Sequence, residues 1–239
     1  MATQRGPKIV TRGLLEYWDA ADIKSYPRTG TTWYDLSGRS KNSTLTNGPV
    51  WSSTYGGGFV FDNTDDYITA GAAGADGNMM SSSAITLTAW FYTDYYLGGK
   101  YLLYYGRPVN TGVDGWAFYL GSGGGTTNVY AEIVGTNNIS YGFTSSNGAY
   151  GFSVPTYAVL TYDRVNVKMY VNAVQVLSSA LTQYIRVGAF GDSVINIGAA
   201  GNDYGRFNGT IYSASIYNRA LSATEVLQNF NTHRGRFRI

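Results

Sequence analysis

The chain has 239 residues, a formal net charge of +2 and no cysteine, and only 13% of its residues are charged. The missing cysteines exclude disulfides, thiolate nucleophiles and sulfur-ligated metals. No apolar run approaches the roughly 18 residues of a membrane-spanning helix, and no apolar stretch follows the basic residues of segment 1–11, so we expect neither a membrane protein nor a classical export signal.

Alternation of apolar and polar residues predicts β-strands along most of the chain. In Ile85–Tyr92 the odd-numbered residues are apolar, and the even-numbered ones are threonine or aromatic. Val129–Ile133 and Val165–Val171 alternate in the same way. Such a pattern is typical of strands with one face in a core. About a dozen such runs, separated by Gly, Asn, Asp and Ser clusters, predict one all-β antiparallel sandwich. Among these clusters, the glycine-rich segment 121–125 is interpreted as a hairpin loop, because no phosphate-binding Lys-Ser/Thr pair follows it.

One helix is predicted near the C-terminus. Ser222 and Glu225 have the spacing of a capping box, in which each side chain bonds the backbone of the other residue. Leu221, Val226 and Phe230 then form an apolar stripe that can lie on a sheet edge. We therefore divide the chain into a basic arm (1–12), one domain (13–231) and a basic tail (232–239).

The two ends carry part of the positive charge, contributed by Arg5, Lys8, Arg12, Arg234, Arg236 and Arg238. Two interpretations are open. The ends are either solvated tails or arms that dock on an acidic surface of a partner protein. The middle of the chain has no basic stripe, so nucleic acid is not an expected partner.

Several segments together resemble the concanavalin A-like lectin/glucanase superfamily, in its laminin G-like branch. They lie between residues 13 and 231 and are Gly13–Asp19, Gly58–Ile68, Ile85–Phe91, Leu160–Asn172 and Ile195–Ser222. The resemblance implies a jelly-roll of two curved antiparallel sheets and does not specify a function. Two positions depart from the family pattern. Asn63 replaces a glycine and tolerates a left-handed backbone. Ala173 follows Asn172 where Asn-Gly is usual, so a different turn type is expected there.

Residues 26–38 and 225–237 also resemble domains in structural proteins of tailed bacteriophages. This resemblance implies a lectin-like virion protein, either a capsid decoration or a part of a fibre or tail. Its partners would be other virion proteins, in an oligomer or in many copies on one particle, with weak adhesion to glycans. It would assemble in the host cytoplasm, consistent with the missing cysteines. The alternatives are an extracellular location, a purely structural cement domain, and a cellular carbohydrate-binding or adhesion module.

Catalysis is not expected, because the glutamates and the histidine are isolated. Glycosidases need two carboxyls at a defined separation. Here Glu16, Glu132 and Glu225 fall in separate segments, and the only histidine, His233, lies in the basic tail. No cofactor is expected. The one candidate metal site is formed by Asp62, Asp65 and Asp66, which suit calcium by ligand type but are also interpreted as braces of a turn.

Aromatic residues are the candidates for carbohydrate binding, because sugar rings stack on π surfaces. The predicted strands offer Trp90, Tyr92, Trp116 and Tyr119. Alternation places Trp90 and Tyr92 opposite the Ile85–Phe91 face, and it places Trp116 and Tyr119 on opposite sides of one strand. Large aromatic residues in sandwiches also serve as core or as cover for a sheet, and this alternative stays open for each of the four.

Overall fold

The computed structural model describes residues 8–70, 83–94, 98–106, 113–121, 127–187, 193–201 and 204–239, with only the backbone at 113 and 114. The described residues form sixteen strands, a short 3₁₀ helix (η1, Thr54–Gly56) and one α-helix (α1, Ala223–Phe237). The strands are β1 Leu14–Asp19, β2 Thr32–Trp33, β3 Ser43–Thr46, β4 Val50–Ser52, β5 Gly58–Asp62, β6 Tyr67–Ala70, β7 Ile85–Tyr92, β8 Lys100–Gly106, β9 Val113–Leu120, β10 Val129–Val134, β11 Ser140–Thr144, β12 Thr156–Tyr162, β13 Asn166–Val171, β14 Val174–Ala180, β15 Val194–Ile197 and β16 Asn208–Tyr217.

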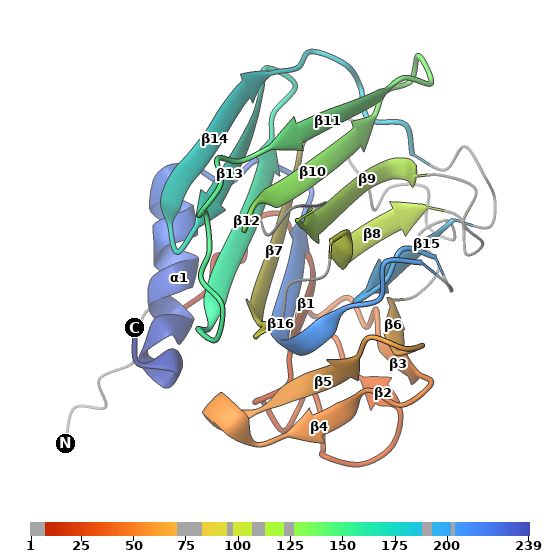
Figure 1. Ribbon diagram of the computed structural model, residues 1–239, viewed down its shortest axis with the longest axis vertical. Helices are drawn as coiled ribbons and strands as arrows, with labels where there is room; N and C mark the ends of the chain where they lie inside the picture. Colours follow the sequence, from red (N-terminus) through yellow and green to blue (C-terminus); the bar gives the residue numbers. More distant parts are fainter. Residues whose placement is uncertain are drawn as a thin grey trace.

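The strands form two antiparallel sheets packed face to face (Figure 1). The back sheet has the order β14-β13-β12-β7-β16-β5-β4, with β1 also paired to β16. The front sheet has the order β11-β10-β9-β8-β15-β6-β3-β2. This arrangement confirms the predicted jelly-roll sandwich with a single C-terminal helix. The glycine-rich segment between β9 and β10 joins two antiparallel neighbours, although residues 122–126 lie outside the described ranges.

The core lies between the sheets and follows the predicted alternation. Ile85, Leu87 and Phe91 of β7 point into it, together with the indoles of Trp18 and Trp33. Edge-to-face contacts fix several of these rings, such as Trp33 against a neighbouring phenylalanine at 5.0 Å between centroids. Burial of aromatic side chains of this size is the main source of stability in such a sandwich.

Helix α1 begins at the predicted capping box. The Glu225 amide donates to Ser222 Oγ at 3.3 Å, and the Ser222 amide donates to Glu225 Oε2 at 2.9 Å. Arg219 holds the same carboxylate through two hydrogen bonds of 2.6 and 2.8 Å. These bonds, led by the one from Arg219, lower the pKa of Glu225 to about 2. The helix start is therefore fixed by side chains, as the sequence predicted.

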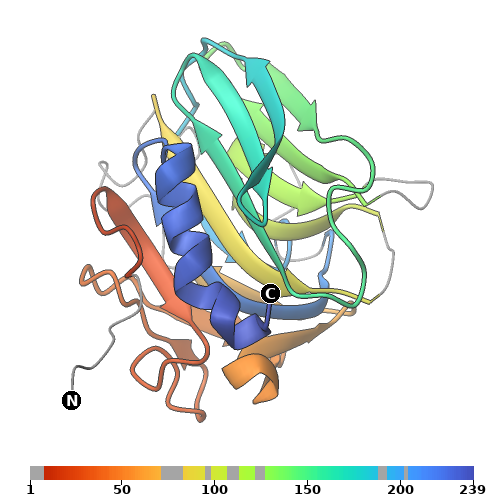
Figure 2. The ribbon, with the colours of Figure 1, turned by 90° about the vertical axis from the view of Figure 1, so that its left-hand side faces the viewer.

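The helix lies across the outer face of the back sheet, not on its edge as expected (Figure 2). Leu221, Val226 and Phe230 are buried against this face. The reason is that β7, β12 and β16 direct large aromatic residues outward, and these need a cover. No helix in the described ranges is both long enough and apolar enough to cross a membrane.

The boundaries predicted for the basic ends need correction. The segment 232–239 is not a separate tail, because α1 continues to Phe237 and brings Arg236 within 2.6 Å of Asp19. Burial alone would raise the pKa of Asp19, but the hydrogen bond to His233 and the charge of Arg236 hold it well below its usual range. The charge of Arg236 is thus neutralised inside the domain by a residue of β1, which no local pattern reveals.

The described part of the N-terminal arm, 8–12, also belongs to the domain. The Val10 amide donates to Asn229 Oδ1 at 2.8 Å, and the Tyr217 hydroxyl donates to the Val10 carbonyl at 3.0 Å. Gln228 Nε2 donates to the carbonyl of Lys8 at 2.8 Å. The first described residues are therefore bonded to α1 and to β16 beneath it.

The two departures from the family pattern have different outcomes. Asn63 has a φ of 68°, as its tolerance of the left-handed region predicted. At the β13–β14 hairpin, φ is 48° at Asn172 and 66° at Ala173, so the turn keeps the two positive φ values of a type I′ turn. The expectation of another turn type was wrong. The Asn172 side chain stabilises this backbone by accepting a hydrogen bond from the Tyr157 amide at 2.9 Å.

Candidate binding surface

Trp90 and Trp116 are not available to a ligand, which corrects their assignment as sugar-binding residues. Trp90 is 1% exposed on the outer face of the back sheet, where Phe230 and Phe237 of α1 cover it. Trp116 is 0% exposed and points into the core beside Tyr105. Both indoles serve packing, the alternative left open from the sequence.

Tyr92 lies on the back sheet, at the end of β7. It is half-buried and lines a shallow pocket of about 330 Å³ with Tyr55, Ser153 and Tyr212. This pocket is on the opposite sheet from Tyr119, so the two predicted tyrosines do not belong to one site.

Tyr119 lies on the outer face of the front sheet and is part of a row of three aromatic rings. Tyr101 and Tyr130 are its direct cross-strand neighbours on β8 and β10. The rings of Tyr101 and Tyr119 are stacked at 4.8 Å between centroids, and those of Tyr119 and Tyr130 at 5.3 Å. We call Tyr101, Tyr119 and Tyr130 the tyrosine row.

The groups around the tyrosine row are polar. Tyr204 contacts Tyr101 at one end, with 6.2 Å between ring centroids. At the other end Glu132 follows Tyr130 on the same face of β10, and Ser140 Oγ donates to Glu132 Oε1 at 2.5 Å. Burial raises the pKa of Tyr119 to about 12, so its hydroxyl stays protonated and can donate a hydrogen bond at neutral pH.

The sequence did not single out Tyr101 and Tyr130 as site residues. The alternation of β10 already placed Tyr130 and Glu132 on the face away from the core. The missing information was the register between β8, β9 and β10. Register decides which outward residues stand side by side, and it depends on contacts between strands.

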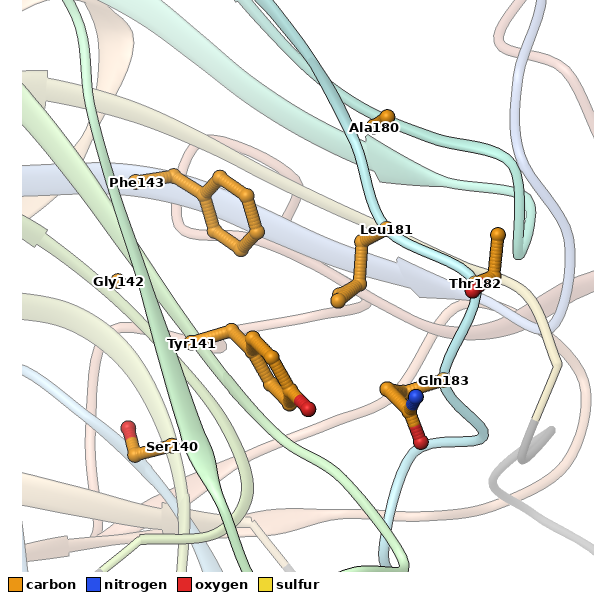
Figure 3. Close-up of a pocket in the computed structure, with 8 residues that line it drawn as sticks. All are labelled: Ser140, Tyr141, Gly142, Phe143, Ala180, Leu181, Thr182 and Gln183. Carbon is orange, nitrogen blue, oxygen red and sulfur yellow. The ribbon is translucent and has the colours of Figure 1, made fainter.

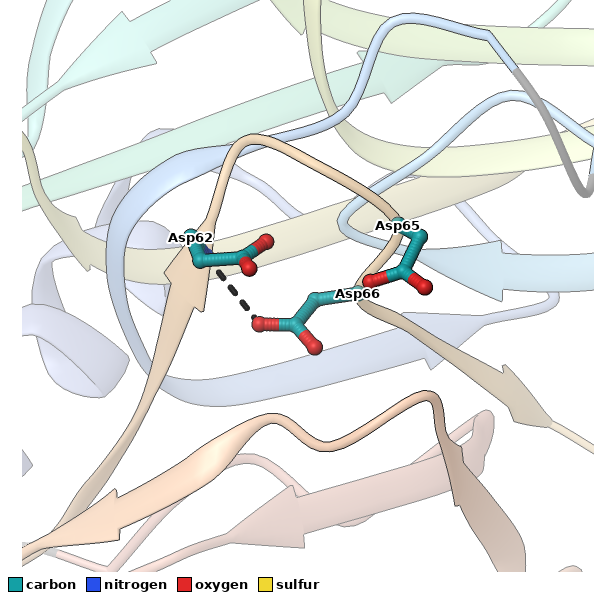
Figure 4. Close-up of side chains that lie close together, drawn as sticks. All are labelled: Asp62, Asp65 and Asp66. Atoms are coloured by element: carbon teal, nitrogen blue, oxygen red, sulfur yellow. Dashed lines mark hydrogen bonds between the residues drawn. The ribbon is translucent and has the colours of Figure 1, made fainter.

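The acidic triad at the β5–β6 turn forms internal hydrogen bonds (Figure 4). Asp66 Oδ2 accepts from the Asp62 amide at 3.0 Å, and Asp62 Oδ1 accepts from the Thr64 amide at 2.7 Å. The three carboxylates, including Asp65, lie within 4.8 Å of one another. Burial raises the pKa of Asp66. Lys100 Nζ of β8 donates to the side chain of Asn63, which lies in this turn. These contacts fit the interpretation as turn braces, and calcium binding stays a prediction.

A second pocket of about 450 Å³ opens between β11 and segment 180–183, where edge strands of the two sheets face each other (Figure 3). Tyr141, Phe143 and Leu181 form its apolar wall, with Gln183 at one side. The Asn137 side chain donates to the Tyr141 hydroxyl at 2.8 Å and holds that ring. The inner face of β11 therefore borders this pocket, and its outer face borders the tyrosine row.

The six basic residues proposed as docking arms separate into three groups. Lys8, Arg12, Arg234 and Arg238 are exposed. Arg236 is held by Asp19 and by the Gly57 carbonyl at 2.9 Å, so it is not free to dock. Arg5 lies outside the described residues.

The three glutamates occupy unrelated places. Glu16 is buried in β1, Glu132 lies on the outer face of the front sheet, and Glu225 caps α1. The single histidine is on α1, where His233 Nε2 lies 2.9 Å from the Tyr17 hydroxyl and 3.5 Å from Asp19 Oδ2. The contacts of Glu225 and His233 account for these residues as parts of the helix attachment.

Two packed antiparallel sheets, one covered by a helix and one with a polar aromatic outer face, define a lectin-type jelly-roll domain. The chain belongs to the concanavalin A-like lectin/glucanases superfamily, whose laminin G-like family model matches residues 62–227. A search of curated proteins finds no match.

Solved structures share the fold at low sequence identity. One is domain 4 of AbnA, an extracellular arabinanase of Geobacillus stearothermophilus in complex with arabinotriose. It has a TM-score of 0.64 and 16% identity, and the match covers 94% of this chain and 99% of that one. The binding domain of botulinum neurotoxin serotype G has a TM-score of 0.66 and 17% identity, and the match covers 91% of this chain and 50% of that one. The binding domain of botulinum neurotoxin DC in complex with SialylT has a TM-score of 0.65 and 12% identity. That match covers 93% of this chain and 52% of the toxin domain. The chain thus spans about half of the toxin binding domains.

Proposed function

We propose that this chain is a non-catalytic carbohydrate-binding domain that binds glycans on the outer face of the front sheet. The observation that carries the proposal is the tyrosine row on the face that α1 does not cover. Its half-buried rings Tyr119 and Tyr130 stand side by side there, and Tyr101, which is 9% exposed, supports Tyr119 from the other side. Aromatic rings with protonated hydroxyls suit a sugar, because its C–H faces need an apolar surface and its hydroxyls need hydrogen-bond partners.

Two of the solved structures with this fold support the proposal, since they were determined with arabinotriose and with SialylT. The placement of the three glutamates supports a binding role without catalysis. A glycosidase needs an acid and a base or nucleophile on either side of one bond. Glu132 is the single glutamate on the face that carries the tyrosine row, and Ser140 donates to it.

The expected result of replacing Tyr119 by serine is a loss of glycan affinity of about tenfold or more, because the middle ring of the row is removed. Binding to a printed glycan array, followed by calorimetry with the best neutral oligosaccharide, measures it. The matched control is Tyr92→Ser, which removes a half-buried tyrosine from the opposite sheet and should leave affinity unchanged. Binding by both variants at the wild-type level, with unchanged circular dichroism, would exclude the tyrosine row.

We further propose that the domain works on a bacteriophage particle, as a capsid decoration or as part of a fibre or tail. The support is the resemblance of residues 26–38 and 225–237 to structural proteins of tailed phages. Many copies on one particle would convert weak glycan contacts into firm adhesion. Mass spectrometry of purified particles should detect the protein in tens of copies or more. Its absence from particles would favour the alternative of a cellular adhesion module.

A further inference from the structure

The end of the tyrosine row at β11 has an open side. Tyr119 stacks against one face of the Tyr130 ring, so the other face points toward the neighbouring strand β11. The residue of β11 directly opposite Tyr130 is Thr144, and the residue opposite Glu132 is Gly142. Neither Thr144 nor Gly142 has a side chain large enough to cover an aromatic ring.

Gly142 leaves a gap in the sheet surface at this point. A Cβ atom added to it would meet no described atom within 4 Å, and its φ is not in the left-handed region. The backbone therefore does not require glycine here. What the glycine provides is free space beside Tyr130 and Glu132, with the hydroxyls of Ser140 and Thr144 on the same face of β11.

We infer that Tyr130, Glu132, Gly142 and Thr144 form a subsite for one neutral sugar ring, stacked on the free face of Tyr130 above Gly142. This inference rests on the proposed function and specifies its ligand class. The Glu132 carboxylate, oriented by the hydroxyl of Ser140, accepts hydrogen bonds from sugar hydroxyls. It also repels the carboxylates of sialic and uronic acids, since two unpaired negative charges at contact distance disfavour binding.

The experiment compares wild type and Gly142→Leu on an array of neutral, sialylated and uronate-containing glycans. Wild type should bind a neutral glycan at least tenfold more tightly than its sialylated counterpart. Gly142→Leu should lose at least tenfold in affinity, with an unchanged melting temperature, because its side chain fills the open space. The matched control is Thr44→Leu, which places the same leucine side chain at an exposed position of β3 on the same face.

The possible outcomes distinguish failure of the subsite from failure of the proposed glycan-binding function. Binding of a neutral glycan that Gly142→Leu abolishes and Thr44→Leu preserves supports the subsite. If wild type binds a glycan and Gly142→Leu binds it equally well, or if sialylated glycans are preferred, the subsite is wrong and the proposed function stands. If wild type binds no glycan on the array, the proposed function itself fails.

Discussion

Replacement of Trp90 by alanine is expected to lower the free energy of unfolding by about 4 kcal/mol. The indole is 1% exposed and lies at the centre of the contact between the back sheet and α1. Its ring centroid is 4.2 Å from that of Phe237, 5.1 Å from Tyr157 and 5.6 Å from Phe230. Alanine would leave a cavity that a helix attached at both ends cannot close.

Urea unfolding at pH 6 measures this loss, and hydrogen exchange of the α1 amides should become faster. The control is Leu227→Ala on the solvent side of the same helix, where the side chain is 45% exposed, with an expected change within about 0.5 kcal/mol. A loss below 1 kcal/mol for Trp90→Ala would contradict the described packing of α1 on the sheet.

The second large effect concerns pH and the buried carboxyl of Glu16. This side chain is 1% exposed, and neither carboxyl oxygen has a hydrogen-bond partner among the described residues. Burial, and then the negative charge of Asp35, raises the pKa of Glu16 from 4.5 to about 8. Between these two values the folded state holds a proton that the unfolded state has released. The free energy of unfolding therefore falls as pH rises, by about 1.4 kcal/mol per pH unit, or about 4 kcal/mol from pH 5 to pH 8.

Glu16→Gln should remove most of this slope, because a neutral amide replaces the carboxyl at every pH. The variant should accordingly be more stable than wild type at pH 8 and similar to it at pH 5. Denaturant unfolding at half-unit steps between pH 4.5 and 8.5 measures both curves. Glu132→Gln, which changes a half-exposed glutamate on the other sheet, tests whether loss of any glutamate suffices. Parallel curves for wild type and Glu16→Gln would show that Glu16 ionises normally in the folded protein.

Local patterns predicted the elements well, because period-2 alternation and a capping box depend on residues close together in the chain. The core face of β7 and the start of α1 followed from Ile85–Tyr92 and from Ser222 and Glu225. The end of the helix did not follow from a local pattern, because Arg236 is neutralised by Asp19, which lies 217 positions away. A run of basic residues at the C-terminus resembles a solvated tail unless that partner is known.

The candidate site was predicted only in part for the same reason. Of the four aromatic residues singled out, Tyr119 lies on the proposed surface. Alternation assigned Trp90 correctly to the outer side of its strand, but it carries no information about which outer face the helix covers. The stacking of Tyr119 with Tyr101 and Tyr130 depends on the register of three strands, including a bulge in β8 between Tyr101 and Leu103.

Segment 8–12 and helix α1 lie on the same side of the sandwich, which determines the surface that stays open. Segment 8–12 is bonded to α1, which covers the back sheet, whereas the tyrosine row lies on the outer face of the opposite sheet. A partner that contacted segment 8–12 or α1 would therefore leave the tyrosines exposed on the opposite side. Immobilisation through this side of the molecule should therefore leave the proposed glycan surface accessible.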